Sequence, residues 1–427
     1  MIGYAGLSHL GVVSAAAAAA KGFQVVGFDP ETTLFDALEH GDLPVMEPGL
    51  PQLLAANLTR LTFSDDPSRL RDCGVIYISV DVPIDDRGSS DLTPVDSLLE
   101  TVVANSAPDA VVVVLSQVNP GFTRRRVRRV QTEKRRLLYQ VETLIFGSAV
   151  ERALYPERFV VGCADPAEPL PPQFSEYLAA FGCPILPMRL ESAELTKIAI
   201  NMFLTSAVTT TNMLAEICEA VGADWTEIAP SLRLVKRIGS NAYLQPGLGI
   251  GGTNLLRDMV TIQTIASEWG TDAAPVDAWI ANSRWRRDWA LRTLHRKVLG
   301  RTPTATVAVW GLAYKENTAS TRNSPGVELL TALKGFRRRA YDPAARLDLP
   351  GDRLYVQCNA PIDACENADV LLIMTPWPEL ATVEPVAIRA AMRGRMVIDP
   401  FGLLSTTACA AAGLGHVRLG VSEGPGC

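Results

Sequence analysis

The chain has 427 residues, 48% of them hydrophobic and 20% charged, which is typical of a globular protein with two or three domains. Its formal net charge of -6 argues against a nucleic-acid or membrane-surface partner. The eight cysteines and four histidines form no C-x-x-C motif or histidine cluster, so we expect no metal site and no disulfide framework. The apolar opening lacks the basic residues of a signal peptide, and we expect a cytoplasmic protein without a transmembrane helix.

Short β-branched runs alternate with helix-like stretches over the first 185 residues. Because these runs are uncharged inside, they fit buried parallel strands joined by crossover helices. The expected strands are 1–5, 23–29, 74–80, 110–116 and 158–163. The basic run at 123–136 is interpreted as a solvated helix face rather than a phosphate or partner patch.

A helix-rich middle follows, with long helical patterns at 192–222 and 274–300. The alternation then returns, and strands are expected within 304–311, 337–343, 369–377 and 395–400. This order predicts an α/β protein: two Rossmann-like parallel-sheet domains, joined by a central helical region with one long helix. The expected domains are 1–188, 189–300 and 301–427.

The amino terminus carries a dinucleotide-binding pattern, Gly6-x-Ser8-x-x-Gly11, between a strand and an alanine-rich helix. Gly6 permits a tight turn, Ser8 lets the backbone approach a pyrophosphate, and Gly11 lets helix and strand pack closely. The second strand ends at Asp29, whose carboxylate can hold both ribose hydroxyls and would repel a 2′-phosphate. The pattern therefore predicts NAD as the cofactor in preference to NADP.

Several further motifs occur in a fixed order along the chain. They are the segments 41–50 (GDLPVMEPGL), 115–123 (LSQVNPGFT), 141–162, 193–204 (AELTKIAINMFL), 237–252 (RIGSNAYLQPGLGIGG) and 311–325 (GLAYKENTASTRNSP). Over nearly its full length the chain resembles the UDP-glucose/GDP-mannose dehydrogenase family. The resemblance implies an amino-terminal NAD domain, a central helix used for homodimerisation, and a carboxy-terminal domain that helps bind a nucleotide sugar.

The resemblance also implies a reaction and a departure from it. The family oxidises a primary alcohol at C6 twice, and a cysteine in a G-G-S-C motif holds the aldehyde as a thioester precursor. This chain reads Gly251-Gly252-Thr253-Asn254 at that motif. Because an amide nitrogen is not a nucleophile at neutral pH, Asn254 cannot form a thioester.

Other parts of the catalytic machinery are retained. Lys197 and Asn201 are four residues apart and share one helix face. By resemblance they meet Asp258 around the reacting carbon, where the ammonium stabilises an alkoxide, Asn201 orients a hydroxyl or water, and Asp258 accepts a proton. Glu142 matches a further acid–base carboxylate of the family. We expect Lys197, Asn201, Asp258, Glu142 and Asn254 to form the catalytic set.

The resemblance extends to the binding residues. For the cofactor these are Gly6, Ser8, Leu10, Gly11, Asp29, Ser116, Arg257 and Arg322. For the substrate they are Leu144, Arg237, Tyr243, Leu244, Gly251 and Lys315. Arg237 is expected to reach the site of the neighbouring subunit, while Lys315 and Arg322 are candidate anchors for a diphosphate.

Four positions depart from the family pattern. Gln117 replaces a threonine, Phe146 a glutamate, Arg257 a lysine, and Phe401 an arginine near VIDPFG. Groups tied to hydride abstraction therefore remain, while the cysteine and its neighbours are changed. The residues leave four functions open: a single oxidation to an aldehyde or ketone, a redox-neutral epimerisation that uses NAD, direct oxidation of an aldehyde hydrate to an acid, and a silent binding protein.

Overall fold

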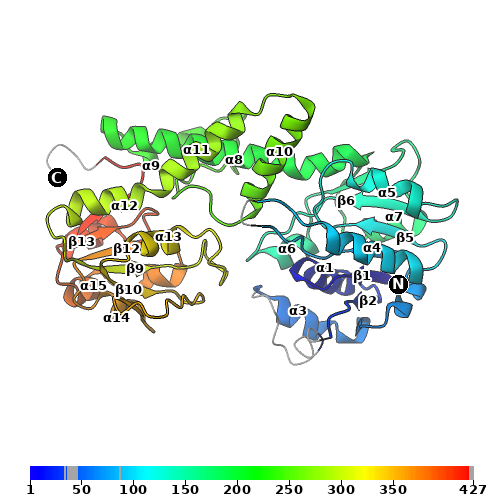
Figure 1. The fold of residues 1–427 in the computed structure, drawn as a ribbon, viewed down its shortest axis with the longest axis horizontal. Helices are drawn as coiled ribbons and strands as arrows, with labels where there is room; N and C mark the ends of the chain where they lie inside the picture. The colour runs from blue at the N-terminus through cyan, green and yellow to red at the C-terminus, as the bar shows by residue number, and fades with distance from the viewer. Residues whose placement is uncertain (33–34, 36–46, 86–87, 423–427) are drawn as a thin grey trace. The chain divides into compact units, whose positions relative to one another are not determined.

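A computed structural model describes residues 1–32, 35, 47–85 and 88–422; most of the motif at 41–50 therefore lies outside the described residues. The chain divides into two compact units, Met1–Ile200 and Asn201–Cys427. The long helix α8 (Leu190–Val221) runs from the first unit into the second (Figure 1). Each unit is built on its own sheet.

The first unit contains an eight-stranded sheet in the order β3-β2-β1-β4-β5-β6-β7-β8. All neighbouring strands are parallel except β6 and β7, which pair antiparallel. The strands are β1 (Ile2–Ala5), β2 (Val25–Phe28), β3 (Leu61–Ser64), β4 (Val75–Ile78), β5 (Val111–Val114), β6 (Arg136–Gln140), β7 (Phe159–Cys163) and β8 (Ile185–Arg189). The five strands expected from the sequence are therefore present, and β3, β6 and β8 are additional.

Helices cover this sheet as crossovers (Figure 1). They are α1 (His9–Ala20), α3 (Leu50–Ala56), α4 (Thr93–Asn105), α5 (Phe122–Val130), α6 (Ala149–Leu154) and α7 (Pro172–Ala179). Helix α1 is alanine-rich and buried along most of its length, because small side chains let it lie directly on the sheet. The first part of the basic run forms α5, whose Arg126 and Arg129 pair with carboxylates of α4; the Arg129 side chain is exposed, whereas Arg126 is largely shielded.

The second unit contains a six-stranded, fully parallel sheet in the order β11-β10-β9-β12-β13-β14. The strands are β9 (Thr306–Trp310), β10 (Arg337–Tyr341), β11 (Tyr355–Gln357), β12 (Val370–Ile373), β13 (Met396–Ile398) and β14 (Gly415–Val417). In sequence order this is 3-2-1-4-5-6, the order also found for the first six strands of the first unit and typical of a doubly wound fold. The predicted fold class is confirmed.

The helices of the second unit fall into two groups. The helical region before the sheet contains α9 (Trp225–Leu234), α10 (Asn254–Trp269), α11 (Ala274–Arg287) and α12 (Trp289–Leu294). Those packed on the sheet are α13 (Pro325–Ala332), α14 (Pro361–Cys365), α15 (Pro385–Ala391) and α16 (Thr406–Ala411). The expectation of one continuous helix over 274–300 is wrong: the helix breaks at Asp288 and ends in a π-helical turn, His295–Leu299. Apolar residues recur at helical spacing across both the break at Asp288 and the π-helical turn, so the sequence pattern does not reveal either feature.

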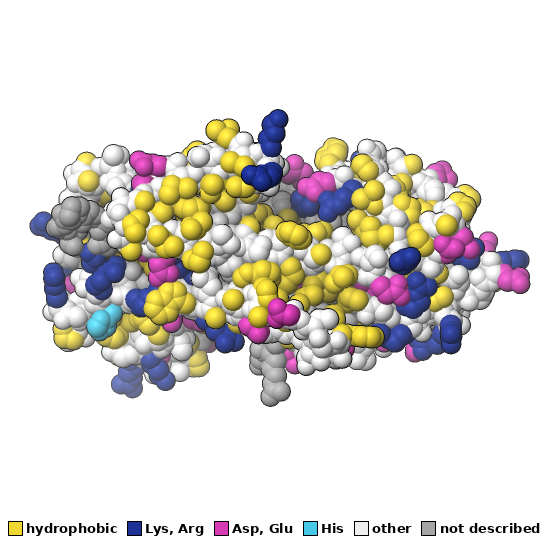
Figure 2. Space-filling model, turned by 90° about the horizontal axis from the view of Figure 1, so that it is seen from above, with side chains coloured by type: hydrophobic (Ala, Val, Ile, Leu, Met, Phe, Trp, Pro, Cys, Tyr) yellow, Lys and Arg dark blue, Asp and Glu magenta, His cyan; other side chains and the backbone are white. Residues whose placement is uncertain are grey.

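Helix α8 combines packed and exposed faces. Near its start, the Glu194 carboxylate accepts backbone N–H groups of Gly121 at 2.5 Å and Thr123 at 2.8 Å. Among the described helices, α8 alone is long and apolar enough to cross a membrane, a test that the core helix of a soluble protein also passes. Within the second unit it exposes Phe203, Met213 and other apolar side chains. Figure 2 shows hydrophobic side chains gathered on this helical face of the second unit.

Candidate active site

The turn between β1 and α1 requires glycine at two positions. Gly6 has φ +94°, and a Cβ atom there would lie 2.7 Å from the backbone nitrogen of Val80. A Cβ atom on Gly11 would collide with the carbonyl oxygen of Gly6. Ser8 caps α1; its hydroxyl donates to the Ser79 carbonyl at 3.2 Å and accepts the Asp81 N–H at 2.8 Å. The turn therefore presents the start of α1 without side chains in the way, as a pyrophosphate requires.

Asp29 follows β2 at the carboxyl edge of the sheet. Its carboxylate accepts the Leu7 N–H at 2.7 Å and the Glu31 N–H at 3.0 Å, so it is fixed beside the glycine turn. The side chain is only half-buried and keeps lone pairs for ribose hydroxyls. Ser116 is fully buried, and its hydroxyl donates to the carbonyls of Ile78 and Val80. Turn and carboxylate together fit the adenosine half of NAD.

Glu142 and Lys197 form an ion pair in the first unit. Lys197 Nζ lies 3.3 Å from Glu142 Oε2, and both side chains are largely shielded from solvent, at 14% and 16% exposure. The second carboxylate oxygen of Glu142 accepts the N–H of Leu144, which orients the group. The structure thus brings together two residues that the sequence places on separate motifs.

A buried carboxylate that the sequence reasoning missed anchors the loop after Glu142. Glu47 accepts the N–H groups of Gly147 at 2.9 Å and Ala149 at 2.8 Å, and lies 3.0 Å from His9 Nε2. The ring of Phe146 stacks on His9 with centroids 4.2 Å apart. Because His9 is the first residue of α1, the cofactor turn and the Glu142 loop are tied together. The acidic residue in the motif at 41–50 was the only sequence signal for this contact.

Asp81 lies close to the same groups, at the carboxyl end of β4. Desolvation by the surrounding protein raises the pKa of its carboxyl, an effect that His9 and the Ser8 hydroxyl partly oppose and Glu142 reinforces. Asp81 as a whole is nevertheless exposed to solvent. A carboxyl with a raised pKa beside Glu142 gives this end of the sheet a second group able to hold a proton.

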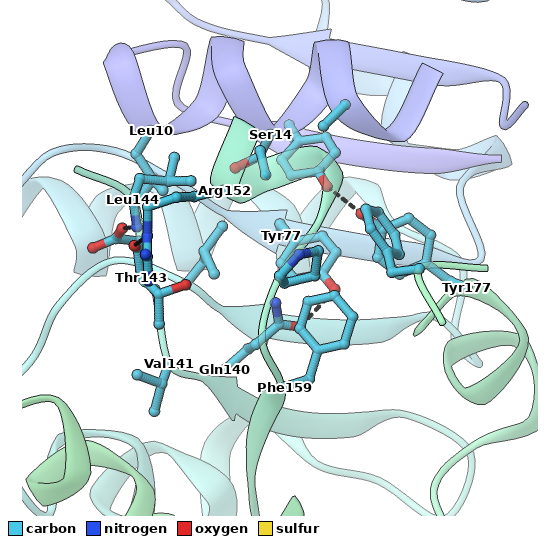
Figure 3. A pocket seen from close by; sticks show the side chains of 17 residues that line it. Leu10, Ser14, Tyr77, Gln140, Val141, Thr143, Leu144, Arg152, Phe159 and Tyr177 are labelled. Atoms are coloured by element: carbon cyan, nitrogen blue, oxygen red, sulfur yellow. Dashed lines mark hydrogen bonds between the residues drawn. The ribbon is translucent and has the colours of Figure 1, made fainter. Parts of the chain in front are cut away.

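A small cavity lies behind the Glu142 loop, between α1 and the sheet (Figure 3). Leu10 and Leu144, both expected at the binding site, line it together with Ser14. Its far side is closed by tyrosines: Tyr77 donates to Gln140 Oε1 at 2.8 Å, and the hydroxyl oxygens of Tyr4 and Tyr177 lie 2.7 Å apart. These polar groups already form hydrogen bonds with one another. We therefore interpret the cavity as part of the packing behind the loop and not as a separate ligand site.

Asn201, Arg257 and Asp258 come together in the second unit. Asn201 Nδ2 donates to Asp258 Oδ2 at 2.5 Å, and Arg257 Nε donates to Asp258 Oδ1 at 3.0 Å. All three residues are buried, Asp258 completely. The guanidinium balances the carboxylate charge, so a buried acceptor is held in a defined orientation. Lys197 and Asn201 lie one turn apart on α8.

The glycine-rich loop 247–252 is clamped from several sides. Gly252 has φ +70°, and a Cβ atom there would lie 2.7 Å from the Tyr314 ring. Its carbonyl accepts the Asn323 amide at 2.8 Å, and the Ile250 N–H donates to Ser283 Oγ at 2.8 Å. Asn254 is the exposed first residue of the following helix, α10. The conformation of the loop is therefore fixed by the surrounding protein, and the loop leads directly to the Asn254 side chain.

The remaining expected residues are spread over the second unit. Arg237, Tyr243 and Arg322 are exposed, Leu244 is buried, and Lys315 lies 5.8 Å from the ring centroid of Tyr314. Gly251 packs on Tyr314 within the loop. Of the departures from the family pattern that the resemblance implies, Gln117 and Phe146 lie in the first unit, whereas Phe401 lies half-buried in the second.

None of the described cysteines is an activated nucleophile. Burial raises the pKa of all seven thiols: to about 11 for Cys73, Cys163 and Cys409, to about 12 for Cys365, and upward for Cys183, Cys218 and Cys358. A raised pKa leaves less thiolate at neutral pH than an exposed cysteine has. The cysteines that the structure describes are therefore packing residues.

Three models of one protein family match consecutive parts of the chain. The NAD binding domain of the UDP-glucose/GDP-mannose dehydrogenase family matches residues 1–175, its central domain matches 191–283, and its UDP binding domain matches 308–406. The glycine turn with Asp29 lies in the first match, and the Asn201–Asp258 pair lies in the second.

Related proteins cover nearly the whole chain. UDP-glucose 6-dehydrogenase TuaD of Bacillus subtilis is 32% identical over 97% of this chain and 92% of its own length. UDP-glucose 6-dehydrogenase of Pseudomonas aeruginosa is 30% identical over 97% and 96%. The solved UDP-glucose dehydrogenase of Pyrobaculum islandicum superimposes with a TM-score of 0.81 at 28% identity, covering 93% of each chain. The chain belongs to the UDP-glucose/GDP-mannose dehydrogenase family and is an NAD-dependent enzyme of the nucleotide-sugar dehydrogenase type.

Proposed function

We propose that this enzyme oxidises one hydroxyl group of a UDP-sugar once, giving an aldehyde or ketone and one NADH per substrate molecule. The observation that carries the proposal is Asn254 at the start of α10, which by the resemblance of the loop sequence stands at the family's cysteine position. The raised pKa of every described cysteine supports it further, because no activated thiol takes over the role of the missing one. Without a thioester, the usual route to a carboxylic acid is closed.

The retained groups are sufficient for a single oxidation. NAD, when bound, accepts a hydride from the substrate carbon. Lys197 supplies a positive charge for the developing alkoxide, and its pairing with Glu142 fixes the ammonium in place. Asp258, oriented by Asn201 and Arg257, accepts the hydroxyl proton. These roles require Lys197 and Asn201 to act on one substrate, which their spacing on α8 favours.

We also propose that the enzyme is a homodimer whose subunits meet along α8. The apolar side chains Phe203, Met213, Ile217 and Val221 are 47 to 79% exposed and follow one stripe of the helix. Exposed apolar stripes of this kind on long helices are typical of subunit interfaces. Arg237, exposed after α9, would then be available to the neighbouring subunit.

The decisive experiment counts NADH. Purified enzyme, NAD and a panel of UDP-sugars are followed by absorbance, and each product is identified by mass. One NADH per sugar with an aldehyde or ketone product supports the proposal. Two NADH per sugar with an acid product contradicts it and favours oxidation of the aldehyde hydrate, while an isomerised product without NADH favours an epimerase.

A further inference from the structure

The last residue of α11, Arg287, lies against the glycine-rich loop 247–252, within the second unit. Only 12% of its side chain is exposed, and burial lowers the pKa of the guanidinium, an effect that the Glu328 carboxylate opposes. An arginine nevertheless keeps its charge at neutral pH. A charge shielded in this way needs fixed acceptors, and the five N–H groups of a guanidinium can connect several chain segments at once.

Arg287 joins the loop to the segment that leads into α13. Its Nη2 donates to the carbonyl of Ile250 in the loop and to the carbonyl of Asn323 at 3.3 Å. Its Nη1 donates to Asn323 Oδ1 at 2.7 Å and to the carboxylate of Glu328 in the first turn of α13. One guanidinium therefore connects helix α11, the glycine-rich loop and the segment 323–328.

Asn323 makes a second connection between the same two segments. Its Nδ2 donates to the Gly252 carbonyl at 2.8 Å, while its Oδ1 accepts the hydrogen bond from Arg287. The backbone of Asn323 has φ +55°, a conformation that asparagine adopts more readily than most other residues. Arg287 and Asn323 thus form a hydrogen-bonded pair that holds the loop at two carbonyls, those of Ile250 and Gly252.

The loop also packs directly on α11. Gly249 has φ +76°, and a Cβ atom there would lie 2.5 Å from the Ser283 carbonyl oxygen and 3.1 Å from Arg287 Cγ. Asn254 follows two residues after Gly252. The position of Asn254 therefore depends on how α11 holds the loop.

The opposite side of the pair leads to Arg322, the candidate diphosphate anchor that directly precedes Asn323. We propose that Arg287, acting through Asn323, is a positioning residue of the active site. It sets the spacing between the loop that leads to Asn254 and the segment that carries Arg322, so that both meet one substrate molecule. The inference rests on the proposed function, in which Asn254 stands at the reacting end of a UDP-sugar.

Steady-state kinetics with NAD and a UDP-sugar that yields NADH test this role. Arg287→Lys keeps the charge but loses the planar fork, and should lower kcat about 10- to 100-fold, the range for a small misplacement of reacting groups. The rate is expressed per NAD-binding site, counted by titration, so that unfolded enzyme does not contribute. The KM for NAD should stay unchanged, because the glycine turn lies in the first unit. Arg284→Lys, at an exposed position of the same helix, is the matched control and should retain full kcat.

Asn323→Gly tests the pair from its other member. Glycine adopts a positive φ without strain, so this variant removes the side-chain hydrogen bonds and keeps the backbone. It should lower kcat as Arg287→Lys does, and the double variant should be no slower than the slower single variant, because both changes break one connection. Losses that multiply in the double variant would overturn the joint action of Arg287 and Asn323.

Hydrogen exchange supplies a readout that needs no turnover. Arg287→Lys should speed exchange in peptides that cover 247–253 and leave β9 and β12 unchanged, while Arg284→Lys should change neither. Equal kcat in Arg287→Lys and the unmodified enzyme would overturn the positioning role, yet NADH formation would still uphold the proposed function. Absence of NADH with every UDP-sugar would refute the proposed function. Faster exchange of the loop in Arg287→Lys would then still uphold its attachment through Arg287, and unchanged exchange would overturn it.

Discussion

Asp29 and Asp342 occupy the same place in the two sheets, each directly after the second strand of its unit, yet their carboxylates are used differently. Asp29 accepts two backbone N–H groups and is half-buried. Asp342 is fully buried and accepts four backbone N–H groups and the indole of Trp377. In both units a glycine with positive φ, Gly6 or Gly311, directly follows the first strand. The second sheet thus has the same arrangement of glycine and carboxylate as a dinucleotide-binding sheet. The Asp342 carboxylate, however, is already hydrogen-bonded to protein groups.

This difference predicts opposite effects for one substitution. Asp29→Ala should weaken NAD binding and narrow the preference for NAD over NADP, with little change in melting temperature, because the loss falls on a half-exposed group. Asp342→Ala leaves buried donors unpaired and should destabilise the second unit by about 3 kcal/mol or more. Cofactor titration and thermal denaturation distinguish the two. Equal NAD and NADP affinity in the unmodified enzyme would contradict the role of Asp29.

Lys197→Met should lower kcat/KM on the order of 100- to 10,000-fold, because it removes the charge that stabilises the alkoxide. NAD affinity should remain within a few-fold, since Lys197 lies outside the glycine turn. Lys236→Met, at an exposed position after α9, is the control and should retain full activity. A Lys197→Met enzyme that turns over at the normal rate would remove Lys197 from the mechanism.

Glu47→Gln keeps the shape of the loop anchor and removes half of its acceptor capacity. One of the N–H groups of Gly147 and Ala149, or His9, then loses its partner. The free energy of unfolding should fall by about 1–3 kcal/mol. The larger effect should be on kcat rather than on the KM for NAD, because the loop carries Glu142. An unchanged kcat in a folded protein would show that the anchor is purely structural.

The sequence predicted the fold correctly where the strand patterns are strongest. The β-branched runs that became β1, β2, β4 and β5 are continuous, apolar and fully buried. By contrast, β8 contains Pro187 and is largely exposed at the sheet edge, and β6 opens with the last arginine of the basic run, so neither shows a clean strand pattern.

For the site, the motifs named Glu142, Lys197 and Asp258, but their partners depend on contacts between distant segments. The anchor of Glu47 on Ala149 spans 102 residues. A local sequence pattern does not predict contacts between such distant segments, because these contacts depend on the order of the strands in the folded sheet.

Phe203→Asp tests the proposed dimer. Phe203 is 79% exposed on α8, so a charge there costs the isolated subunit little but would be desolvated in an apolar interface. Light scattering at micromolar concentration should show a dimer for the unmodified enzyme and a monomer for the variant. Glu227→Lys, a charge change at an exposed position of α9, should leave the dimer intact. A fully active monomer of the unmodified enzyme would contradict the interface.

Asn254→Cys tests the single-oxidation proposal most directly. In the unmodified enzyme the described cysteines have raised pKa values, so iodoacetamide at pH 7 should leave turnover unaffected, and no covalent adduct with substrate should form. The new thiol stands exposed at the amino end of α10, where the helix dipole favours its thiolate. The variant should therefore become sensitive to iodoacetamide and hold the aldehyde product as an adduct detectable by mass.

The number of NADH molecules formed per sugar by the Asn254→Cys variant shows whether the remaining residues can support a second oxidation. By the resemblance, Gln117 and Phe146 stand where the family has a threonine and a glutamate, and both remain in the variant, so we expect hydrolysis of a thioester to be slow. We expect little more than one NADH per sugar, with the second equivalent appearing over a much longer time. Rapid formation of two NADH and an acid by Asn254→Cys would show that the cysteine alone was missing. The same result from the unmodified enzyme would refute the single oxidation, because Asn254 would then not block the second step.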